Sequence, residues 1–294
     1  MPAPILQFIL LFLLGIVVAA DMEKGEVEVT SSAETLGVDT GKTGASQQQQ
    51  LHPIHPERTQ RDGYVIEAIY YHNSTCFTQG LVWDPVSGNL IESCGLYEES
   101  HIDVYSPEKK KVYYRKRLPS HVFGEGVAVY KDTLITLTWR EKIGFKFRVE
   151  GSSLKQLGSF PIKTSDEEGW GATVIQIHDK DYFLVSDGTC NLHLWDPETL
   201  EEVDRKCITV DNEPAQYLND LQVVKGKIYA NVWLDDRIAV IDWEKGVVEK
   251  WIDLFYLRRL RKIPDTKFAQ NNAVLNGIAY NAEKDVLYVT GKSW

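Results

Sequence analysis

The chain has 294 residues, of which 43% are hydrophobic and 25% charged, so it is long enough to bury a sizeable core. Its 32 Lys+Arg are outnumbered by 42 Asp+Glu, which gives a formal net charge of -10. This acidic balance argues against nucleic acid (DNA or RNA) or an anionic membrane surface as the main partner.

The N-terminal segment contains one apolar run, residues 5–20. The run is short for a membrane span, which needs about 20 apolar residues, and it ends in small residues before Asp21, as at a signal-peptide cleavage site. The basic residues that usually precede such a run are absent, so an uncleaved anchor is the alternative. We therefore predict a signal peptide or signal anchor in residues 1–20.

Residues 21–62 differ in character, because they are polar, lack aromatic residues and contain a run of four glutamines. Such a composition cannot bury enough apolar surface to offset its ordering entropy, so we predict a disordered linker. Four cysteines and a single N-glycosylation pattern at Asn73 favour the secretory pathway. We expect a secreted glycoprotein, or one in the ER or Golgi lumen if the anchor is retained.

Short alternating strands fill residues 63–294, and a similar stretch recurs along them. The recurring stretches align on Gly80, Gly126, Gly171, Asp220 and Gly277, with spacings of 46, 45, 49 and 57 residues. A repeat of this length with about four strands per unit is typical of a β-propeller with one unit per blade. We predict an all-β, five-bladed β-propeller catalytic domain; a β-sandwich is the alternative, but it does not explain the repeat.

The fifth unit supplies only two strands before residue 294. The strand at residues 64–70 precedes the first unit, so it is expected to close the ring as the outer strand of this last blade. The third strand of that blade is then expected to be missing. We accordingly expect Lys292 near a fraying end, and a shortened form of the protein with reduced stability and activity.

The cysteines fit the predicted hairpins. Facing residues of an antiparallel hairpin have a constant sum of numbers, which places Cys76 nearly opposite Cys94 and Cys190 opposite Cys207. We predict these two disulfides, with four buried free thiols as the alternative.

Polar and aromatic side chains gather where the repeat places the channel ends of the strands. The residues before the aligned positions form one ring, Gln79, Glu125, Trp170, Asn219 and Asn276. The ends of the next strands form another, Gly95, Trp139, Asp187, Trp233 and Lys292. Each residue alone is more often structural, but together they describe an aromatic box for a small polar group.

The motifs "CFTQGLVWD", "FGEGVAV", "EGWGAT", "YANVW" and "LYVTGK" resemble those of the glutaminyl-peptide cyclotransferase family of plants and bacteria. The resemblance covers residues 64–294 and implies a five-bladed propeller. It also implies a glutaminyl cyclase, an aminoacyltransferase that converts N-terminal glutamine to pyroglutamate and releases ammonia. By position, it implies a pocket of nine residues: Phe77, Gln79, Phe123, Glu125, Trp139, Trp170, Asn219, Trp233 and Lys292. Asp220 departs from the glutamate that the family often has there.

The reaction needs an unprotonated α-amine and a protonated leaving nitrogen, so a single group can shuttle the proton. We predict that Glu125 is this shuttle, that Lys292 stabilises the oxyanion, and that Gln79 and Asn219 bind the substrate. No His/Cys cluster has zinc spacing, so no metal or other cofactor is expected for catalysis, although a structural cation in the channel is compatible with the sequence.

Two other functions are weighed against this one. A non-catalytic propeller could use the same box to hold a peptide N-terminus, and the incomplete last blade favours it. A calcium-dependent propeller hydrolase would need several carboxylate ligands, whereas three of the ten ring positions are tryptophan. The expected partners are peptides or proteins with N-terminal glutamine. The protein is expected to be a monomer that touches the membrane only through an uncleaved anchor.

Overall fold

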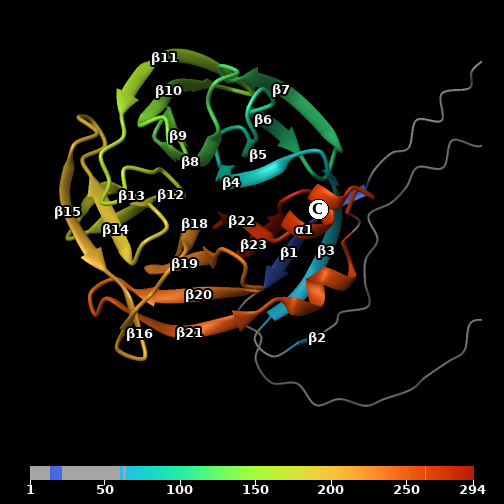
Figure 1. Ribbon diagram of the computed structural model, residues 1–294. Coiled ribbons are helices and arrows are strands. Elements are labelled where there is room, and N and C mark those ends of the chain that lie inside the picture. Colours follow the sequence, from blue (N-terminus) through green and yellow to red (C-terminus); the bar gives the residue numbers. More distant parts are fainter. Residues whose placement is uncertain (1–13, 22–59, 62–63, 262) are drawn as a thin grey trace, which may run out of the picture.

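The computed structural model describes residues 14–21, 60–61, 64–261 and 263–294. This part of the chain is almost entirely β-structure, arranged as sheets around a central axis (Figure 1). Its helices are short, a 3-10 turn η1 (Phe255–Arg259) and an α-helix α1 (Lys267–Asn272). None of these described helices is long and apolar enough to cross a membrane. The prediction of an all-β, propeller-like fold is confirmed.

Four sheets are each built from one continuous stretch of chain, as predicted for the repeat units. The first contains β4 (Phe77–Asp84), β5 (Asn89–Gly95), β6 (His101–Ser106) and β7 (Lys111–Arg117). The second contains β8 (Gly124–Tyr130), β9 (Thr133–Thr138), β10 (Ile143–Glu150) and β11 (Ser153–Pro161). The third contains β12 (Ala172–Ile177), β13 (Lys180–Ser186), β14 (Asn191–Trp195) and β15 (Glu202–Cys207). The fourth contains β18 (Leu218–Val224), β19 (Lys227–Val232), β20 (Arg237–Asp242) and β21 (Val247–Asp253), with the short β16 (Thr209–Val210) and β17 (Glu213–Pro214) at its edge.

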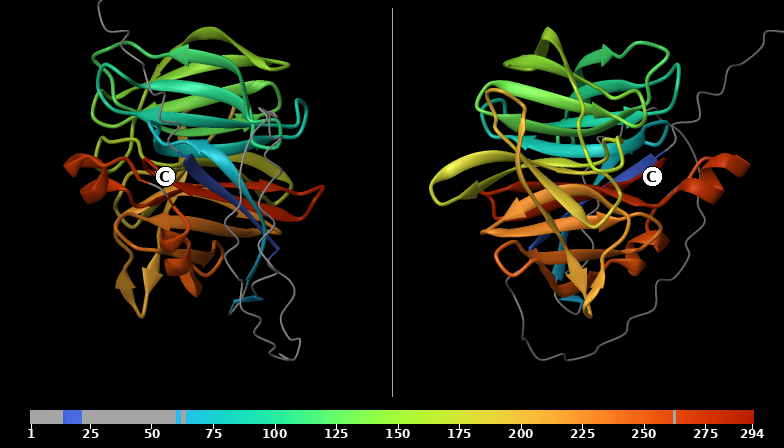
Figure 2. Two further views of the ribbon diagram at one scale, coloured as in Figure 1. Left: turned by 90° about the vertical axis from the view of Figure 1, so that its right-hand side faces the viewer. Right: turned by 60° about the vertical axis from the view of Figure 1, so that its left-hand side comes forward.

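The remaining sheet combines strands from the two ends of the chain. Its order is β2 (Gln60–Arg61), β3 (Tyr64–Asn73), β1 (Leu14–Asp21), β23 (Val286–Gly291) and β22 (Leu275–Asn281). The predicted strand at residues 64–70 therefore belongs to the same sheet as the last two strands, and it extends to Asn73. Figure 2 shows these N-terminal strands beside the C-terminal ones.

The expectation of an empty third position in this sheet is wrong, because β1 pairs antiparallel with both β23 and β3. Its sequence, LGIVVAAD, is apolar and contains three consecutive β-branched residues, a composition that favours a strand. An open position there would leave two facing rows of backbone N–H and C=O groups unpaired. The predicted signal peptide or anchor in residues 1–20 stays a prediction, since residues 1–13 lie outside the described part. The linker prediction likewise falls almost wholly on residues that the structure does not describe.

The recurring glycines lie where neighbouring inner strands approach each other. The five inner strands contact one another in cyclic order, β4, β8, β12, β18 and β22. A Cβ atom on Gly126 would lie 2.4 Å from the Trp170 carbonyl oxygen, and one on Gly171 would lie 1.9 Å from the Asn219 carbonyl oxygen. Larger residues would push the strands apart, so glycine recurs at these positions because the inner strands pack closely around the axis.

Apolar side chains from adjacent sheets form the core between them. Ile91 of β5, Val127 of β8 and Phe147 of β10 belong to one such cluster, while Leu184 of β13 and Leu221 of β18 belong to another. All five are buried. This sheet-to-sheet packing fixes the orientation of each inner strand, and therefore of the side chains at its end.

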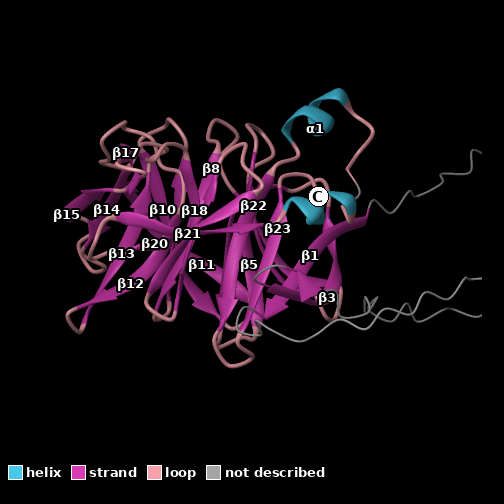
Figure 3. Cartoon of the chain, turned by 90° about the horizontal axis from the view of Figure 1, so that it is seen from below, coloured by secondary structure: helices cyan, strands magenta, loops and turns pink. Residues whose placement is uncertain are grey.

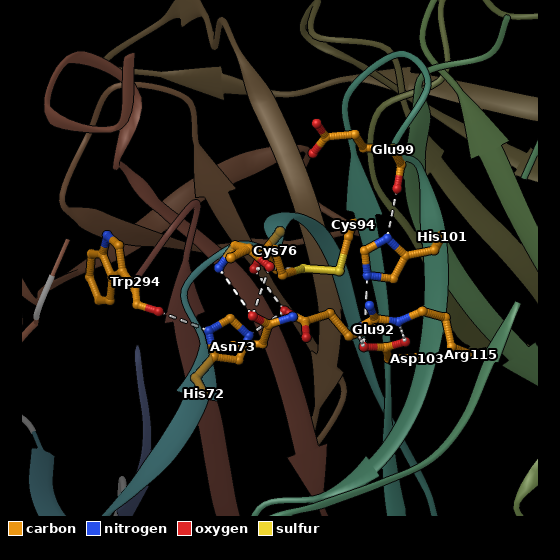
Figure 4. Close-up of a disulfide and its surroundings, with 12 residues drawn as sticks. His72, Asn73, Cys76, Glu92, Cys94, Glu99, His101, Asp103, Arg115 and Trp294 are labelled. Atoms are coloured by element: carbon orange, nitrogen blue, oxygen red, sulfur yellow. Dashed lines mark hydrogen bonds and ion pairs between the residues drawn. A yellow bond between two sulfur atoms is a disulfide. The ribbon is translucent and has the colours of Figure 1, made fainter. Parts of the chain in front are cut away.

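Both predicted disulfides are present, Cys76–Cys94 and Cys190–Cys207. The first joins the residue before β4 to β5, and Figure 4 shows it beside a buried polar cluster. In that cluster His72 of β3 contacts Glu92 of β5, Nε2 to Oε1, at 2.7 Å, and the backbone oxygen of Trp294, through Nδ1, at 3.0 Å. One histidine thus links the N-terminal strand, the first sheet and the C-terminal segment.

The segment after β23 is firmly held, so the expected fraying at Lys292 is wrong. The backbone N–H groups of Lys292 and Ser293 donate to the carbonyl oxygens of Val274 and Cys76, respectively, each at 2.9 Å. Trp294 is only 1% exposed and packs in the core. Burial of this large aromatic side chain anchors the residues just before it.

Candidate active site

A cavity of about 520 Å³ lies at one end of the inner strands. The structure places all nine predicted pocket residues around it: Phe77, Gln79, Phe123, Glu125, Trp139, Trp170, Asn219, Trp233 and Lys292. The roles assigned to these residues in catalysis and binding stay predictions.

The repeat explains why residues so distant in sequence meet here. Gln79 of β4, Glu125 of β8 and Asn219 of β18 occupy equivalent positions at the starts of inner strands. Trp139 and Trp233 follow directly after the next strands, β9 and β19. Adjacent strands run antiparallel, so the start of one and the end of the next lie at the same edge.

Seven of the sixteen residues that line the cavity are aromatic, and several of their rings meet in edge-to-face contacts. The ring centroids of Trp170 and Trp233 lie 6.0 Å apart at 87°, and those of Phe123 and Trp139 lie 5.6 Å apart at 63°. Such pairs favour fixed ring orientations. The aromatic part of the cavity wall therefore has a defined shape.

Glu125 is the buried carboxylate of this cavity, only 5% exposed. Burial raises its pKa well above that of an ordinary glutamate, because water no longer stabilises the charged form. The Lys292 charge opposes this rise, and the charges of Glu168, Glu141 and Asp220 reinforce it. A raised pKa makes the carboxyl a better proton carrier between substrate atoms than an ordinary glutamate.

Lys292 carries the opposite charge to Glu125, lines the same cavity and is also buried. Its Nζ donates a 2.6 Å hydrogen bond to Gln79 Oε1 and lies 4.9 Å from the centroid of the Phe77 ring. Burial lowers its pKa to about 8, while the charges of Glu125 and Asp220 act in the opposite direction. The ammonium is therefore fixed in direction and still charged at neutral pH.

Asn219 offers an unused acceptor. The residue lines the cavity, and its buried side-chain Oδ1 has no hydrogen-bond partner among the described residues. A buried amide oxygen without a partner is costly, so a bound molecule that donates to it would gain affinity.

Three other members of the predicted rings do not line the cavity. The Asn276 amide donates to the carbonyl oxygens of Thr78 and Gln79, which ties the last inner strand to the first. The Asp187 carboxylate contacts the His193 ring at 3.0 Å. Gly95 leaves space, since a Cβ there would lie 2.5 Å from the Phe123 ring. These positions support the site and do not face it.

The sequence reasoning missed several cavity residues. Those outside the predicted set are Leu96, Arg140, Asp166, Glu168, Tyr217, Phe268 and Asn272. Phe268 and Asn272 belong to α1, which projects beyond the strand ends in Figure 3. Glu168 carries a signal that could have been found, because it begins the "EGWG" stretch and tryptophan N–H groups near a cavity need an acceptor.

A group of potential metal ligands lies elsewhere, at His72, Cys76 and Glu92. Cys76 is bonded to Cys94, so it offers no thiolate to a metal. The prediction that catalysis needs no metal stays a prediction.

Comparison with known proteins identifies the family. The family model described as glutamine cyclotransferase matches residues 34–294. The chain belongs to this family. It is 32% identical over 232 residues to a glutaminyl-peptide cyclotransferase from Arabidopsis thaliana, a match that covers 78% of this chain and 68% of that protein. The crystal structure of glutaminyl cyclase from Myxococcus xanthus is 29% identical, with a TM-score of 0.66, and the match covers 76% of this chain and 90% of that one.

Membership of the glutamine cyclotransferase family makes the cavity the candidate active site. The family match includes every residue that lines it, from Phe77 to Lys292. The glycosylation prediction at Asn73 stays a prediction; its side-chain oxygen accepts hydrogen bonds from the backbone N–H and hydroxyl of Thr75.

Proposed function

We propose that this protein is a glutaminyl-peptide cyclotransferase, which converts the N-terminal glutamine of peptides and proteins to pyroglutamate and releases ammonia. The observation that carries the proposal is a buried carboxylate and a buried ammonium facing one aromatic cavity in a chain of the glutamine cyclotransferase family. The relatives named glutaminyl-peptide cyclotransferase and glutaminyl cyclase support it.

In the proposed reaction the α-amine nitrogen attacks the side-chain carboxamide carbon, and a five-membered lactam forms as the C–N bond to the leaving nitrogen breaks. Glu125 takes the proton that the attacking amine loses and delivers it to the leaving nitrogen, which departs as ammonia. The raised pKa of Glu125 suits this exchange. Acid–base transfer of this kind contributes about 10²–10⁴-fold to a rate.

Lys292 is assigned to the oxygen of the tetrahedral intermediate, which gains negative charge as the amine attacks. The Gln79 contact aims the ammonium, and burial strengthens its interaction with that charge. Asn219 accepts a hydrogen bond from the substrate amine or carboxamide. The tryptophan wall holds the glutamine side chain curled for ring closure, which lowers the entropic part of the barrier.

The proposal also covers the blade that completes the fold, the cellular compartment and the substrates. We assign the composite sheet of β22, β23, β1, β3 and β2 as a fifth blade, supported by the cyclic contacts of the inner strands. The protein is assigned to the secretory pathway, an assignment that the two disulfides support. Its substrates are free peptide N-termini, and no cofactor takes part in the proposed steps.

The test is a mass measurement on a peptide that begins with glutamine. The protein is expected to remove about 17 Da, the mass of ammonia, and Glu125→Gln is expected to lower kcat by at least about 100-fold. Its Tm should not fall, because the amide removes a buried charge without changing the shape. Glu98→Gln, an exposed glutamate outside the cavity, is the control. Full activity of Glu125→Gln would refute the shuttle, and an unchanged peptide mass with the wild-type protein would refute the function.

A further inference from the structure

Glu168 lies at the meeting point of two cavity tryptophans. Its Oε2 accepts hydrogen bonds from the indole Nε1 of Trp139 at 2.7 Å and of Trp170 at 2.9 Å. Its Oε1 accepts from Arg140 Nε at 2.7 Å. Both carboxylate oxygens are therefore engaged, which leaves Glu168 unsuited to carry a proton between substrate atoms.

The two tryptophans come from different sheets, so an acceptor that both share connects those two sheets at the cavity. Trp139 follows β9 in the second sheet, whereas Trp170 precedes β12 in the third. A single Glu168 oxygen accepts from both indoles and so fixes their relative position, and a charged acceptor makes both hydrogen bonds stronger than a neutral one would. Indole N–H groups beside an apolar cavity need such a partner.

The backbone around Glu168 is itself held. Gly169 N–H lies 3.1 Å from the carbonyl oxygens of both Thr138 and Trp139. The Thr164 hydroxyl donates to the Glu168 carbonyl oxygen at 2.7 Å. The carboxylate therefore has a fixed position relative to the Trp139 backbone, and it can transmit that position to the rings.

Arg140 completes the arrangement from the solvent side. Its guanidinium carbon lies 3.8 Å from the centroid of the Trp139 ring, while its Nε bonds to Glu168. The cation both neutralises the carboxylate and covers one face of the indole. Arg140 thus holds the Glu168 carboxylate and the Trp139 ring together at the solvent side of the cavity.

We propose that Glu168 is a positioning residue for glutamine cyclisation: through two indole hydrogen bonds to one oxygen, it sets the angle of the Trp139 and Trp170 walls that hold the substrate side chain. The inference rests on the proposed function. In this proposal Glu168 acts by orienting the two indole rings and takes no part in proton transfer.

The expected effect is larger than that of losing a surface ion pair. A misplacement of about 1 Å in a substrate-holding wall can cost about 10²-fold in rate. Glu168→Gln has one acceptor oxygen in place of two, so it cannot serve both indoles and Arg140. We expect kcat/KM to fall about 10- to 100-fold, with a rise in KM and a changed near-UV circular dichroism of the tryptophans.

A second readout separates positioning from a merely structural role. The Glu168 charge raises the pKa of Glu125, which also faces Lys292, Glu141 and Asp220. Removing the charge lowers that pKa, so the acid limb of the kcat–pH profile should move to lower pH in Glu168→Gln. Glu168→Asp keeps the charge with a shorter reach, so it should raise KM while leaving the acid limb in place.

The matched control is Glu167→Gln, whose exposed carboxylate pairs with Lys142 and does not line the cavity. It should leave kcat, KM and the spectrum unchanged. Wild-type kinetics and spectrum in Glu168→Gln would overturn the proposal, and so would an equal loss in Glu167→Gln. If the wild-type protein forms no pyroglutamate, the proposed function fails, and the spectra of the two variants still test whether Glu168 sets the rings.

Discussion

Two buried side chains of opposite charge define the chemistry at the scale of single residues. Lys292 and Glu125 share one cavity, and burial shifts the two pKa values toward each other, downward for the ammonium and upward for the carboxyl. Each charge partly offsets the shift of the other. Burial thus favours the proton-carrying form of Glu125 and weakens the hold of Lys292 on its proton.

This arrangement predicts a basic limit to activity. The pKa of Lys292 is lowered to about 8, so the ammonium is lost, and kcat should fall, as pH rises through that value. Lys292→Arg keeps its charge, because the pKa of arginine lies above about 12, so its kcat should not fall in this range even if its maximum is lower. Lys284→Arg, an exposed lysine outside the cavity, should keep the wild-type profile. An identical basic limb in Lys292→Arg would show that another group causes it.

The cavity residues could be predicted wherever the repeat relates them. Gln79, Glu125 and Asn219 occupy equivalent positions, so aligning the repeat units of the chain with one another is enough to bring them together. Glu168 occupies the position that Phe77, Phe123 and Tyr217 hold in other units, so the alignment places it near the cavity without assigning its role. Its role depends on the direction of two indole N–H bonds, a property of side-chain orientation that residue spacing does not record.

At the scale of elements, β1 shows why an apolar run alone is ambiguous. The composition of residues 5–20 suits a leader, and the part that forms β1 also suits a strand. Residues 14–21 form a strand because they fill the position between β3 and β23, two strands more than 200 residues apart in sequence. A pairing between such distant segments cannot be inferred from local pattern.

Removal of β1 should therefore lower stability. A form of the protein that begins at residue 22 loses the strand that pairs with both β3 and β23, and we expect a Tm lower by about 5 °C or more. Val17→Pro should act in the same direction, because proline removes a backbone donor within β1. Ala3→Pro, outside β1, is the control. Equal Tm values for the shortened and full-length forms would show that β1 adds nothing to the sheet.

At the scale of the whole molecule, a buried histidine connects the sheet that combines both ends of the chain with the first sheet. Both ring nitrogens of His72 face acceptors, Glu92 Oε1 and the Trp294 backbone oxygen, so the imidazolium form satisfies both. Burial alone would lower the pKa of His72, but the charge and hydrogen bond of Glu92 and the backbone hydrogen bond outweigh it and raise the pKa. Asp103 adds to this rise.

The raised pKa makes stability depend on pH. The contribution of His72 is fully present below the pKa of the unfolded state, about 6.5, and it is lost as pH rises through the higher folded-state value. His72→Gln should therefore lower Tm most at about pH 6, with a smaller difference at pH 9. His121→Gln, at an exposed position, should show no such trend. A difference in Tm that stays constant between these pH values would contradict the charge-based explanation.

The Cys76–Cys94 bridge has a consequence for how the protein must be handled. The carbonyl oxygen of Cys76 holds the residue after Lys292, and Gln79, three residues further on, aims the lysine itself. The disulfide thus fixes the segment that holds both the backbone next to Lys292 and the Lys292 ammonium. Both cysteines are buried, so reductant should reach the bond only when the chain opens, and protein that folds without the bridge should turn over more slowly than the oxidised protein. Production in an oxidising cellular compartment and assays in reductant-free buffer are accordingly the conditions under which its full rate is to be measured.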